Sequence, residues 1–539
     1  MSEYVRWPDA LAARYRQDGY WRGEVLGTLL TDWALTDGDR IAIVDRHRRW
    51  TYAELHRTAD RLAAGFRRLG IRAGDRVVVQ LPNVGAFAAV SIGLFRLGAV
   101  PVFALPMHRR SEIVYLCDHA DAVAYVTIDT LLGFDYRALA RDVRREARTV
   151  AHIVIAGDGQ EFPTLSDVEA EAEPLPAPRP SDVAFLLLSG GTTGLPKLIP
   201  RTHDDYAYQM RATAEGLSFD RNGVYLAALP VAHNAALGCP GLLGSLRLGA
   251  KAVLLASPSP DDAFAAIERE GVTLTTLIPP LVQLWLEAAE FNDLDLSGMT
   301  VQVGAARLAP ELGARLQEEW GSLLTQWFGM AEGLLSFTRL ADAEDIARET
   351  VGRPLAQADE IRVVDEHGND VAPGRTGELL TRGPYTIRGY YKADDYNAVT
   401  FTSDGFLRTG DLVSVRPDGN MVVEGRRKDV INRGGEKVAP GEVEDALLLH
   451  PRIREVAVVA MPDPLVGEKI CAFVIARGQP LELPEVRTFL REHGVADFKL
   501  PDRIEHISAL PKTNVGKVDR GQLRELIARA LSSASGSAV

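Results

Sequence analysis

Residues 189–197 read SGGTTGLPK and directly follow the apolar, strand-like run VAFLLL. Two adjacent glycines, Gly190 and Gly191, let backbone amides approach an anion closely, because glycine has no side chain in the way. Thr192 and Thr193 add hydroxyl donors, and Lys197 adds a positive charge. The stretch therefore predicts a loop that cradles the phosphates of a nucleotide.

Two other interpretations of this loop have to be weighed. A P-loop requires the pattern GxxxxGK[ST] leading into a helix. Here Pro196 precedes the lysine and Leu198 follows it, and proline has no backbone N–H to offer a phosphate. The P-loop interpretation fails for this reason. A plain surface turn stays open, since glycine and threonine cluster in turns as well.

The segments around the loop indicate the fold class. From about Ile41 to Ile278, apolar runs such as RVVVQL and KAVLLAS alternate with helical stretches. This alternation predicts layered α/β structure, with sheets covered by helices. The most apolar stretch, residues 86–106, is interrupted by an arginine, a glycine and a proline. It predicts a buried helix followed by a strand and not a membrane-spanning helix.

After Asp359 the sequence pattern changes to short apolar runs separated by turn residues. This pattern predicts a β-rich subdomain over about residues 355–424. The charged, glycine-rich segment GRRKDVINRGGEKV follows. We therefore expect an N-terminal core domain over residues 1–424, a hinge at 425–429 and a small, mobile α+β C-terminal domain over 430–539.

Composition narrows the function classes. The 539 residues are 46% hydrophobic and 25% charged, which is typical of a soluble globular protein. The net charge of −13 argues against general binding to nucleic acid or to an anionic membrane surface. The three cysteines are widely spaced, and the N-terminus lacks the apolar core of a signal peptide. We expect a cytoplasmic protein without a zinc site.

Five motifs stand in a fixed order along the chain: SGGTTGLPK, FGMAEG (328–333), TGD (409–411), EGRRKDVINRGGEKV (424–438) and PKTNVGKVDR (511–520). Together they resemble the motifs of the ANL superfamily of adenylate-forming enzymes, and the resemblance covers nearly the whole chain. It implies the ANL fold, with ATP and Mg²⁺ used to join a carboxylic acid to AMP. Pyrophosphate leaves, and the acyl group then passes to a thiol.

The resemblance also implies residue roles. Both reacting partners are anions, so positive charge must offset their repulsion, and Lys517 resembles the adenylation lysine. Asp411 is similar to the ribose-binding aspartate and Glu332 to the glutamate that positions magnesium; Thr193 completes the implied catalytic set. The implied ATP-binding residues are Ser189, Gly190, Gly191, Thr192, Thr193, Gly194, Lys197, Ala305, Trp327, Ala331, Asp411, Arg426, Lys428 and Lys437.

Three segments resemble the aryl-acid branch of the superfamily, which activates siderophore starter acids: HNAALGCPG (233–241), VGAARL (303–308) and GMAEGLLSFTRL (329–340). Relatives that activate amino acids carry an aspartate for the substrate ammonium, where this chain has Asn234. An amide cannot supply that charge, so an aryl acid fits better. The implied substrate-binding residues are His233, Asn234, Ala235, Cys239, Gly304 and Leu335.

Two positions favour salicylate over 2,3-dihydroxybenzoate. Dihydroxybenzoate enzymes have a serine where this chain has Cys239 and a valine where it has Leu335, so a 3-hydroxyl would find a weaker donor and less room. An unpaired buried hydroxyl costs about 1–3 kcal/mol. Ala235 stands where the branch has an aromatic residue, and Ala305 replaces the second glycine of VGGARL. These two departures leave a substituted or bicyclic aryl acid open.

The expected acceptor is the phosphopantetheine thiol of a separate aryl carrier protein in siderophore or other nonribosomal peptide synthesis, with coenzyme A as the alternative. A non-catalytic sensor of nucleotide or aryl ligand is a further alternative. Its signature would be loss of Lys517, Asp411 or Glu332, and all three are present. A luciferase-like oxygenase would share every ATP motif, and no residue argues for oxygen chemistry.

Overall fold

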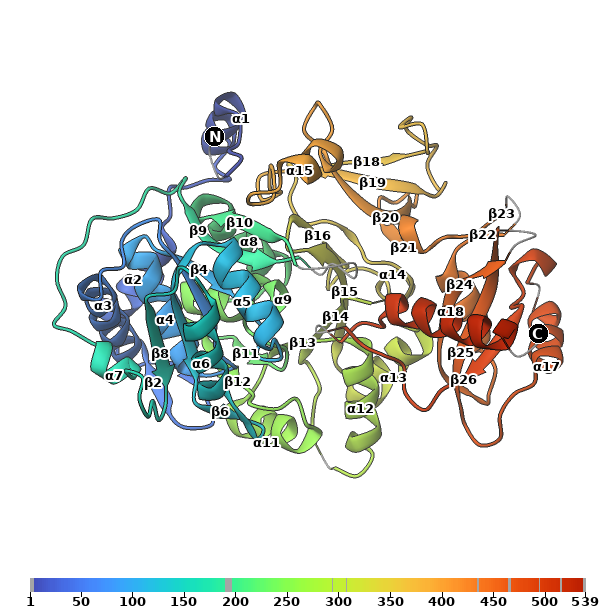
Figure 1. The fold of residues 1–539 in the computed structure, drawn as a ribbon, viewed down its shortest axis with the longest axis horizontal. Helices are drawn as coiled ribbons and strands as arrows, with labels where there is room; N and C mark the ends of the chain where they lie inside the picture. The colour runs from blue at the N-terminus through green and yellow to red at the C-terminus, as the bar shows by residue number, and fades with distance from the viewer. Residues whose placement is uncertain are drawn as a thin grey trace. The chain divides into compact units, whose positions relative to one another are not determined.

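The computed structural model describes residues 4–189, 196–292, 294–306, 308–433, 436–463, 467–493, 495–513 and 516–536. The chain divides into two compact units (Figure 1). The first unit comprises residues 1–189, 195–360 and 381–407, and the second comprises 190–194, 361–380 and 408–539. The second unit thus includes much of the predicted β-rich subdomain as well as the C-terminal segment. The hinge at residues 425–429 stays a prediction.

A nine-stranded sheet forms one layer of the first unit, in the order β17-β16-β15-β14-β13-β11-β12-β1-β2. Strands β1 and β11 to β15 pair in parallel with one another. At the two edges, β2 pairs antiparallel with β1, and β16 pairs antiparallel with β15 and β17. The strands are β1 (Ile41–Val44), β2 (Arg49–Thr51), β11 (Val224–Ala227), β12 (Lys251–Leu254), β13 (Leu274–Leu277), β14 (Thr300–Gly304), β15 (Leu323–Met330), β16 (Gly333–Phe337) and β17 (Arg353–Pro354).

A six-stranded sheet forms a second layer, in the order β10-β9-β4-β3-β5-β8. Its strands are β3 (Arg76–Gln80), β4 (Val100–Phe103), β5 (Ala122–Ile128), β8 (His152–Ala156), β9 (Val183–Leu188) and β10 (Leu198–Thr202). They are parallel apart from the β9–β10 hairpin. Two short strands, β6 (Thr130–Leu131) and β7 (Phe134–Asp135), pair beside them.

Helices of the first unit cover these sheets, as the alternating sequence pattern predicts. Apolar residues of α5 and α6 pack on the six-stranded sheet (Figure 1), and those of α11, α12 and α13 pack on the nine-stranded sheet. The helices are α1 (Asp9–Gln17), α2 (Thr31–Thr36), α3 (Tyr52–Arg68), α4 (Gly85–Leu97), α5 (Arg110–His119), α6 (Tyr136–Glu146), α7 (Leu165–Val168), α8 (His203–Gly216), α9 (Asn234–Gly238), α10 (Gly241–Leu248), α11 (Pro260–Glu270), α12 (Pro279–Ala289), α13 (Pro310–Trp320), α14 (Glu344–Glu349) and α15 (Asp394–Thr400).

The β-rich segment forms a four-stranded sheet in the order β18-β19-β20-β21. Its strands are β18 (Glu360–Val364), β19 (Gly377–Arg382), β20 (Leu407–Val415) and β21 (Met421–Arg426). Turns such as the one around Gly368, which has φ +84°, separate the strands, and glycine adopts this conformation without steric cost.

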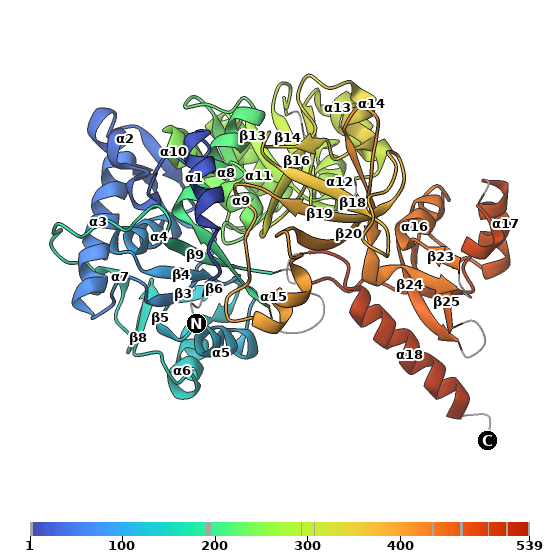
Figure 2. The ribbon, with the colours of Figure 1, turned by 90° about the horizontal axis from the view of Figure 1, so that it is seen from above.

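The C-terminal segment builds a five-stranded sheet, with order β23-β22-β25-β24 and β26 paired to β25. Figure 2 shows α16 and α18 on opposite sides of β24 and β25, and each side has its own apolar cluster. The elements are β22 (Ile431–Arg433), β23 (Glu436–Val438), α16 (Pro440–Leu448), β24 (Ile453–Asp463), β25 (Gly467–Ala476), α17 (Leu483–Glu492), β26 (Arg503–His506) and α18 (Arg520–Gly536).

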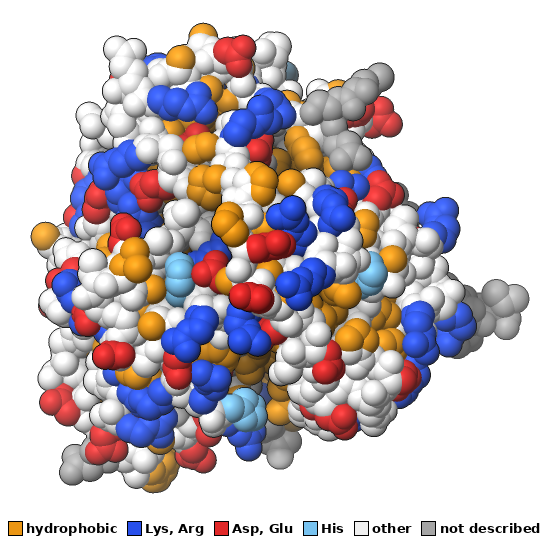
Figure 3. Space-filling view, turned by 90° about the vertical axis from the view of Figure 1, so that its left-hand side faces the viewer, with side chains coloured by type: hydrophobic (Ala, Val, Ile, Leu, Met, Phe, Trp, Pro, Cys, Tyr) orange, Lys and Arg blue, Asp and Glu red, His pale blue; other side chains and the backbone are white. Residues whose placement is uncertain are grey.

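The apolar stretch at residues 86–106 forms α4 and β4, a buried helix followed by a strand, as predicted. Within the described ranges, no helix is long and apolar enough to cross a membrane. Figure 3 shows basic and acidic side chains intermingled on the face viewed there. Cys117, Cys239 and Cys471 are all buried and unbridged.

Candidate active site

The glycine-rich loop connects the two strands of the β9–β10 hairpin. The Ser189 N–H donates to the Lys197 carbonyl at 2.9 Å, and the Lys197 N–H donates to Oγ of Ser189 at 3.0 Å, which closes the base of the loop. A strand follows the lysine, so the strand–loop–helix of a P-loop is not formed. The predicted residues Gly190, Gly191, Thr192, Thr193 and Gly194 lie outside the described residues.

The Lys197 ammonium has an aromatic neighbour that the sequence motif does not contain. Nζ lies 3.9 Å from the ring centroid of Tyr396, in α15. A cation over an aromatic face is attracted by the ring quadrupole. The ring therefore helps to hold the loop lysine in place.

Glu332 and Ala331 occupy the turn between β15 and β16. The Tyr390 hydroxyl donates to Oε1 of Glu332 at 2.9 Å, and the Ile387 N–H donates to the Glu332 carbonyl at 2.8 Å. Across the described part of the chain, no group of three or more His, Cys, Asp and Glu side chains is arranged to hold a metal ion. A single carboxylate fits Mg²⁺ nonetheless, because Mg²⁺ is commonly bound by one or two carboxylates together with substrate phosphates.

Gly304 and Trp327 pair on the neighbouring parallel strands β14 and β15. A Cβ atom on Gly304 would lie 2.4 Å from the Trp327 indole, so the packing of this ring requires glycine at that position. Ala305, the next residue, has φ +66°. This left-handed conformation is strained for alanine and relaxed for glycine, so the replacement of the second glycine of VGGARL places strain at the end of β14.

The predicted acid-binding residues converge at α9. His233 is the N-cap of this helix, and its Nδ1 accepts from the Ala235 N–H at 3.3 Å. Ala235 and Cys239 belong to one buried apolar cluster with Leu335 and Trp327, and Ala305 packs against the same cluster. The structure thus brings residues from three separate sequence segments together. Burial raises the pKa of the Cys239 thiol to about 12, so the thiol is neutral at physiological pH.

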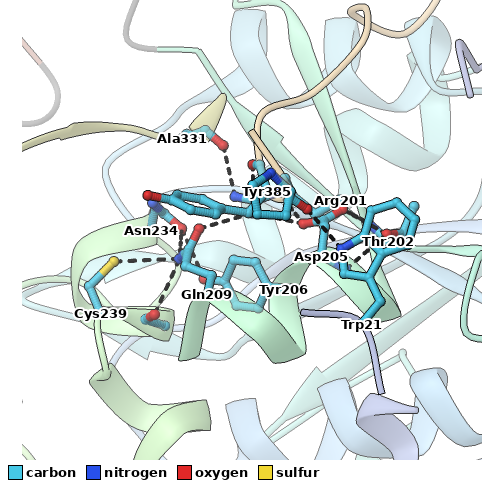
Figure 4. A network of polar contacts seen from close by, with 12 residues as sticks. Trp21, Arg201, Thr202, Asp205, Tyr206, Gln209, Asn234, Cys239, Ala331 and Tyr385 are labelled. Carbon is cyan, nitrogen blue, oxygen red and sulfur yellow. Dashed lines mark hydrogen bonds and ion pairs between the residues drawn. The ribbon is translucent and has the colours of Figure 1, made fainter. Parts of the chain in front are cut away.

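A buried polar network contacts Asn234 and Cys239 (Figure 4). Arg201, at the end of β10, forms an ion pair with Asp205 at 2.7 Å, and both side chains are fully buried. Its guanidinium also donates to the Ala331 carbonyl at 3.0 Å and to Oε1 of Gln209 at 2.9 Å. Nε2 of Gln209 donates in turn to Oδ1 of Asn234 at 3.1 Å. Burial raises the pKa of Asp205, and Arg201 and Thr202 oppose that rise.

The second unit carries its own set of predicted residues. Asp411 and Arg426 are paired across β20 and β21, with Nε of Arg426 2.9 Å from Oδ1 of Asp411. Burial raises the pKa of Asp411, while the charges of Arg426, Lys517 and Lys428 lower it. Burial also lowers the pKa of Lys428. Lys437 pairs with Asn432 in the β22–β23 hairpin, and its side chain lies outside the described residues.

Comparison with known protein families identifies the family to which these site residues belong. The AMP-binding enzyme family matches residues 30–391, and the C-terminal domain of AMP-binding enzymes matches residues 442–517. The chain belongs to the AMP-binding enzyme family. It has the ANL fold, a large N-terminal α/β domain and a small C-terminal domain, and it is an adenylate-forming ligase that uses ATP.

Similar proteins span nearly the full length of this AMP-binding enzyme. The chain is 54% identical over 529 residues to the 2,3-dihydroxybenzoate-AMP ligase of Bacillus subtilis, covering 98% of both chains. It is 45% identical to the salicyl-AMP ligase / salicyl-S-ArCP synthetase of Mycobacterium tuberculosis, covering 99% of this chain and 95% of that one. The apo structure of Mycobacterium smegmatis MbtA matches with a TM-score of 0.75 and 46% identity, covering 97% and 99%.

Several residues of the AMP-binding enzyme's site escape sequence reasoning. These are Arg201, Gln209, Tyr206 and Tyr390, whose partners come from distant segments. The sequence holds one signal: Asp205 and Gln209 are four residues apart after the Thr202 helix cap, which places them on one helical face, and Arg201 directly precedes that cap. Asp205 and Gln209 on the buried face of α8, with Arg201 at the end of β10 before it, indicate a network that has to be satisfied internally.

Proposed function

We propose that this AMP-binding enzyme activates an aryl carboxylic acid, with salicylate as the first choice. It then transfers the aryl group to the phosphopantetheine thiol of a separate carrier protein. The observation that carries the proposal is Asn234, which is 5% exposed and lies next to an apolar cluster at the start of α9. A buried amide cannot balance the ammonium of an amino acid, whereas it suits a neutral ortho substituent on a ring.

The first half-reaction joins the acid to AMP. A carboxylate oxygen attacks the α-phosphorus of ATP, the bond from this phosphorus to the bridging oxygen breaks, and pyrophosphate leaves. Lys517 offsets the repulsion between the two anions, and Asp411 accepts hydrogen bonds from the ribose hydroxyls. The glycine-rich loop and Lys197 hold the departing phosphates. Mg²⁺, held by Glu332 and the phosphates, would neutralise charge that develops during the transfer.

The adenine of ATP is proposed to lie against Ala305, Trp327 and Ala331, where flat apolar or backbone surface suits a base. In the second half-reaction the carrier thiolate attacks the acyl carbonyl carbon, and AMP leaves. Lys517 would obstruct the incoming thiol, so we infer that the C-terminal domain rotates about residues 425–429 between the two steps. Arg426 and Lys428 flank this segment and Lys437 follows it.

A second candidate substrate is 2,3-dihydroxybenzoate, favoured by the 54% identity to a ligase of that name. The substitutions at Cys239 and Leu335 argue for salicylate, because they remove a hydroxyl donor and add bulk. Coenzyme A is the second candidate acceptor, since the same chemistry serves either thiol.

ATP–pyrophosphate exchange across a panel of acids tests the proposal. The panel holds salicylate, 2,3-dihydroxybenzoate, benzoate, a bicyclic aryl acid, an amino acid and a fatty acid. Salicylate should give the highest kcat/KM. A preference for the bicyclic acid would keep the aryl-acid reaction and reject salicylate, and exchange with the amino acid alone would reject the aryl-acid proposal. Transfer to a carrier protein with a free phosphopantetheine thiol and to coenzyme A, measured side by side, decides the acceptor.

A further inference from the structure

A chain of three buried side chains runs from Arg201 through Gln209 to Asn234 (Figure 4). Arg201 and Gln209 are 0% exposed and Asn234 is 5% exposed. The contacts are 2.9 Å from Nη2 of Arg201 to Oε1 of Gln209 and 3.1 Å from Nε2 of Gln209 to Oδ1 of Asn234. All three belong to the first unit, and none forms part of the ATP-binding motifs.

The chemistry of the guanidinium dictates the orientation of both amides. Arginine has five donors and no acceptor, so the Gln209 atom that faces Arg201 must be its carbonyl oxygen. The Gln209 atom that faces Asn234 is then an NH₂ group, which has two hydrogens to donate. One is donated to the Gly238 carbonyl at 3.2 Å and the other to Asn234 at 3.1 Å. Asn234 therefore turns its oxygen inward to accept the hydrogen that Gly238 leaves unpaired.

A second donor strengthens the inward orientation of Asn234. The Tyr206 hydroxyl donates to the same Oδ1 at 3.0 Å. Both lone pairs of the Asn234 oxygen are thus used inside the protein. Within the described residues, the Nδ2 group of Asn234 has no hydrogen-bond partner, so this group is what Asn234 offers to a ligand.

The other contacts of Arg201 fix the direction of the hydrogen bonds from Arg201 through Gln209 to Asn234. It pairs with Asp205 through Nε at 2.8 Å and donates to the carbonyls of Ala331 and Tyr385 at 3.0 and 3.3 Å. The Asp205 carboxylate also accepts from the Thr202 N–H at 2.6 Å, in the capping box that begins α8. Reversal of Gln209 would place its NH₂ group against this guanidinium and leave a buried donor unpaired.

We propose that Arg201 and Gln209 are positioning residues that hold Asn234 as a hydrogen-bond donor toward the acid. The enzyme thereby selects aryl acids that present an acceptor at the ortho position, either a hydroxyl oxygen or a ring nitrogen, over acids with an ortho amino group. The proposal rests on the aryl-acid function proposed above. An aromatic amine donates well and accepts poorly, because its lone pair is delocalised into the ring, so its N–H groups would face the N–H groups of Asn234.

The variant Gln209→Glu tests the orientation directly. A carboxylate accepts at both ends, so it keeps the contact to Arg201, loses the hydrogen bond to the Gly238 carbonyl and favours an Asn234 that presents its NH₂ group inward. The Asn234 oxygen then faces the acid. We expect the ratio of kcat/KM for salicylate over anthranilate to fall by about tenfold or more, mainly through KM, and kcat/KM for anthranilate to rise in absolute terms. A loss of stability alone cannot produce that rise.

A second variant covers the case in which the added charge prevents folding. Gln209→Met removes the Gln209 amide at nearly constant volume. We expect the same ratio to fall, because Asn234 then keeps only the Tyr206 hydroxyl, which can pair with either end of its amide. Gln80→Glu is the matched control, since Gln80 is equally buried in β3 and contacts Tyr125 and the Leu105 and His108 carbonyls. Its ratio should equal that of the wild type. Thermal melting checks that each variant is folded.

The wild-type enzyme separates this inference from the proposed function. Picolinate, which has a ring nitrogen beside the carboxylate-bearing carbon, should exceed benzoate in exchange, and salicylate should exceed anthranilate. If no aryl acid supports exchange, the proposed function fails. If aryl acids are activated but salicylate and anthranilate are used equally, or if the ratio stays constant in the folded Gln209 variants, the positioning role of Arg201 and Gln209 is wrong and the aryl-acid function stands.

Discussion

Nε of Arg426 lies 2.9 Å from Oδ1 of Asp411, and the Asp411 side chain is only 6% exposed. The pair joins Asp411, the proposed ribose-binding residue, to the second residue of the GRRKDVINRGGEKV segment, at the end of β21. Because burial raises the pKa of Asp411 and Arg426 opposes this rise, the arginine helps to keep the carboxylate ionised and able to accept two hydrogen bonds.

Arg426→Met should therefore weaken ATP binding most at low pH. Removal of the cation raises the pKa of Asp411 further, so the acid limb of the pH profile for KM of ATP should move to higher pH. The same substitution at Arg416, which pairs with Asp418 near the surface, is the control. Identical pH profiles for Arg426→Met and the wild type would contradict the proposed role of the pair.

Lys517→Ala should separate the two half-reactions. Loss of one preorganised positive group at the transferring phosphoryl costs about 10²- to 10³-fold, so ATP–pyrophosphate exchange should fall by that factor. Transfer from supplied aryl-AMP should change only a few-fold. Lys512→Ala alters a lysine in the same segment and should leave both steps intact. Unchanged exchange in Lys517→Ala would refute the assignment.

Cys239→Ser should improve 2,3-dihydroxybenzoate relative to salicylate by about tenfold, since a hydroxyl is the better partner for a 3-hydroxyl group. Nε2 of Gln209 already lies 3.5 Å from the Cys239 sulfur, so a serine at this position has a donor beside it. Cys471→Ser, in β25 of the second unit, serves as the control. A constant substrate ratio would mean that Cys239 does not contact the ring.

Asp359→Asn should change how stability depends on pH. Burial raises the pKa of Asp359 from 3.8 to about 7, and the Tyr385 hydroxyl donates to this carboxylate at 2.6 Å. Between these two pH values the folded state retains a proton that the unfolded state has released. The stability contribution of Asp359 is therefore greatest below about pH 4 and falls as pH rises to about 7.

The asparagine variant cannot ionise, so its melting temperature should fall less than that of the wild type between these pH values. Asp370→Asn, at a site whose side chain is 65% exposed, should keep the wild-type slope. Parallel melting curves for Asp359→Asn and the wild type would show that Asp359 is ionised in the folded protein throughout.

Glu332→Gln should raise the Mg²⁺ concentration needed for half-maximal exchange by about tenfold or more, because an amide oxygen is a weaker ligand for a hard cation than a carboxylate. The Tyr390 hydroxyl can still donate to the amide oxygen, so the turn should keep its shape. Glu344→Gln, at a 73% exposed side chain, is the control. An unaltered Mg²⁺ dependence would remove Glu332 from the metal site.

The layered α/β architecture could be predicted because apolar periodicity is a local property of the sequence. The stretch at 86–106 is an example, since its interruptions by Gly98 and Pro101 fall where α4 ends and β4 runs. The four-stranded sheet after Asp359 was predictable from its turns in the same way. The order of the five motifs alone indicates the superfamily.

The network around Arg201 could not be predicted in this way. Arginine is mostly exposed in proteins, and Arg201 is 0% exposed. Two of its partners, the Ala331 and Tyr385 carbonyls, lie 130 and 184 residues further along the chain. Backbone strain at Ala305 was equally hidden, because a φ angle is not written in a single residue type. Long-range satisfaction of buried polar groups is decided only by the tertiary fold.

The depth of this network bears on efforts to redirect the enzyme toward new building blocks. A library directed at the proposed ring-lining positions would vary Ala235, Cys239 and Leu335. In the proposed pocket those positions would govern size and shape, whereas the donor or acceptor orientation of Asn234 would be set two side chains away, at Arg201 near the end of β10. A library that leaves Gln209 unchanged would therefore explore larger and smaller rings. It would still select acids with a hydrogen-bond acceptor ortho to the carboxylate.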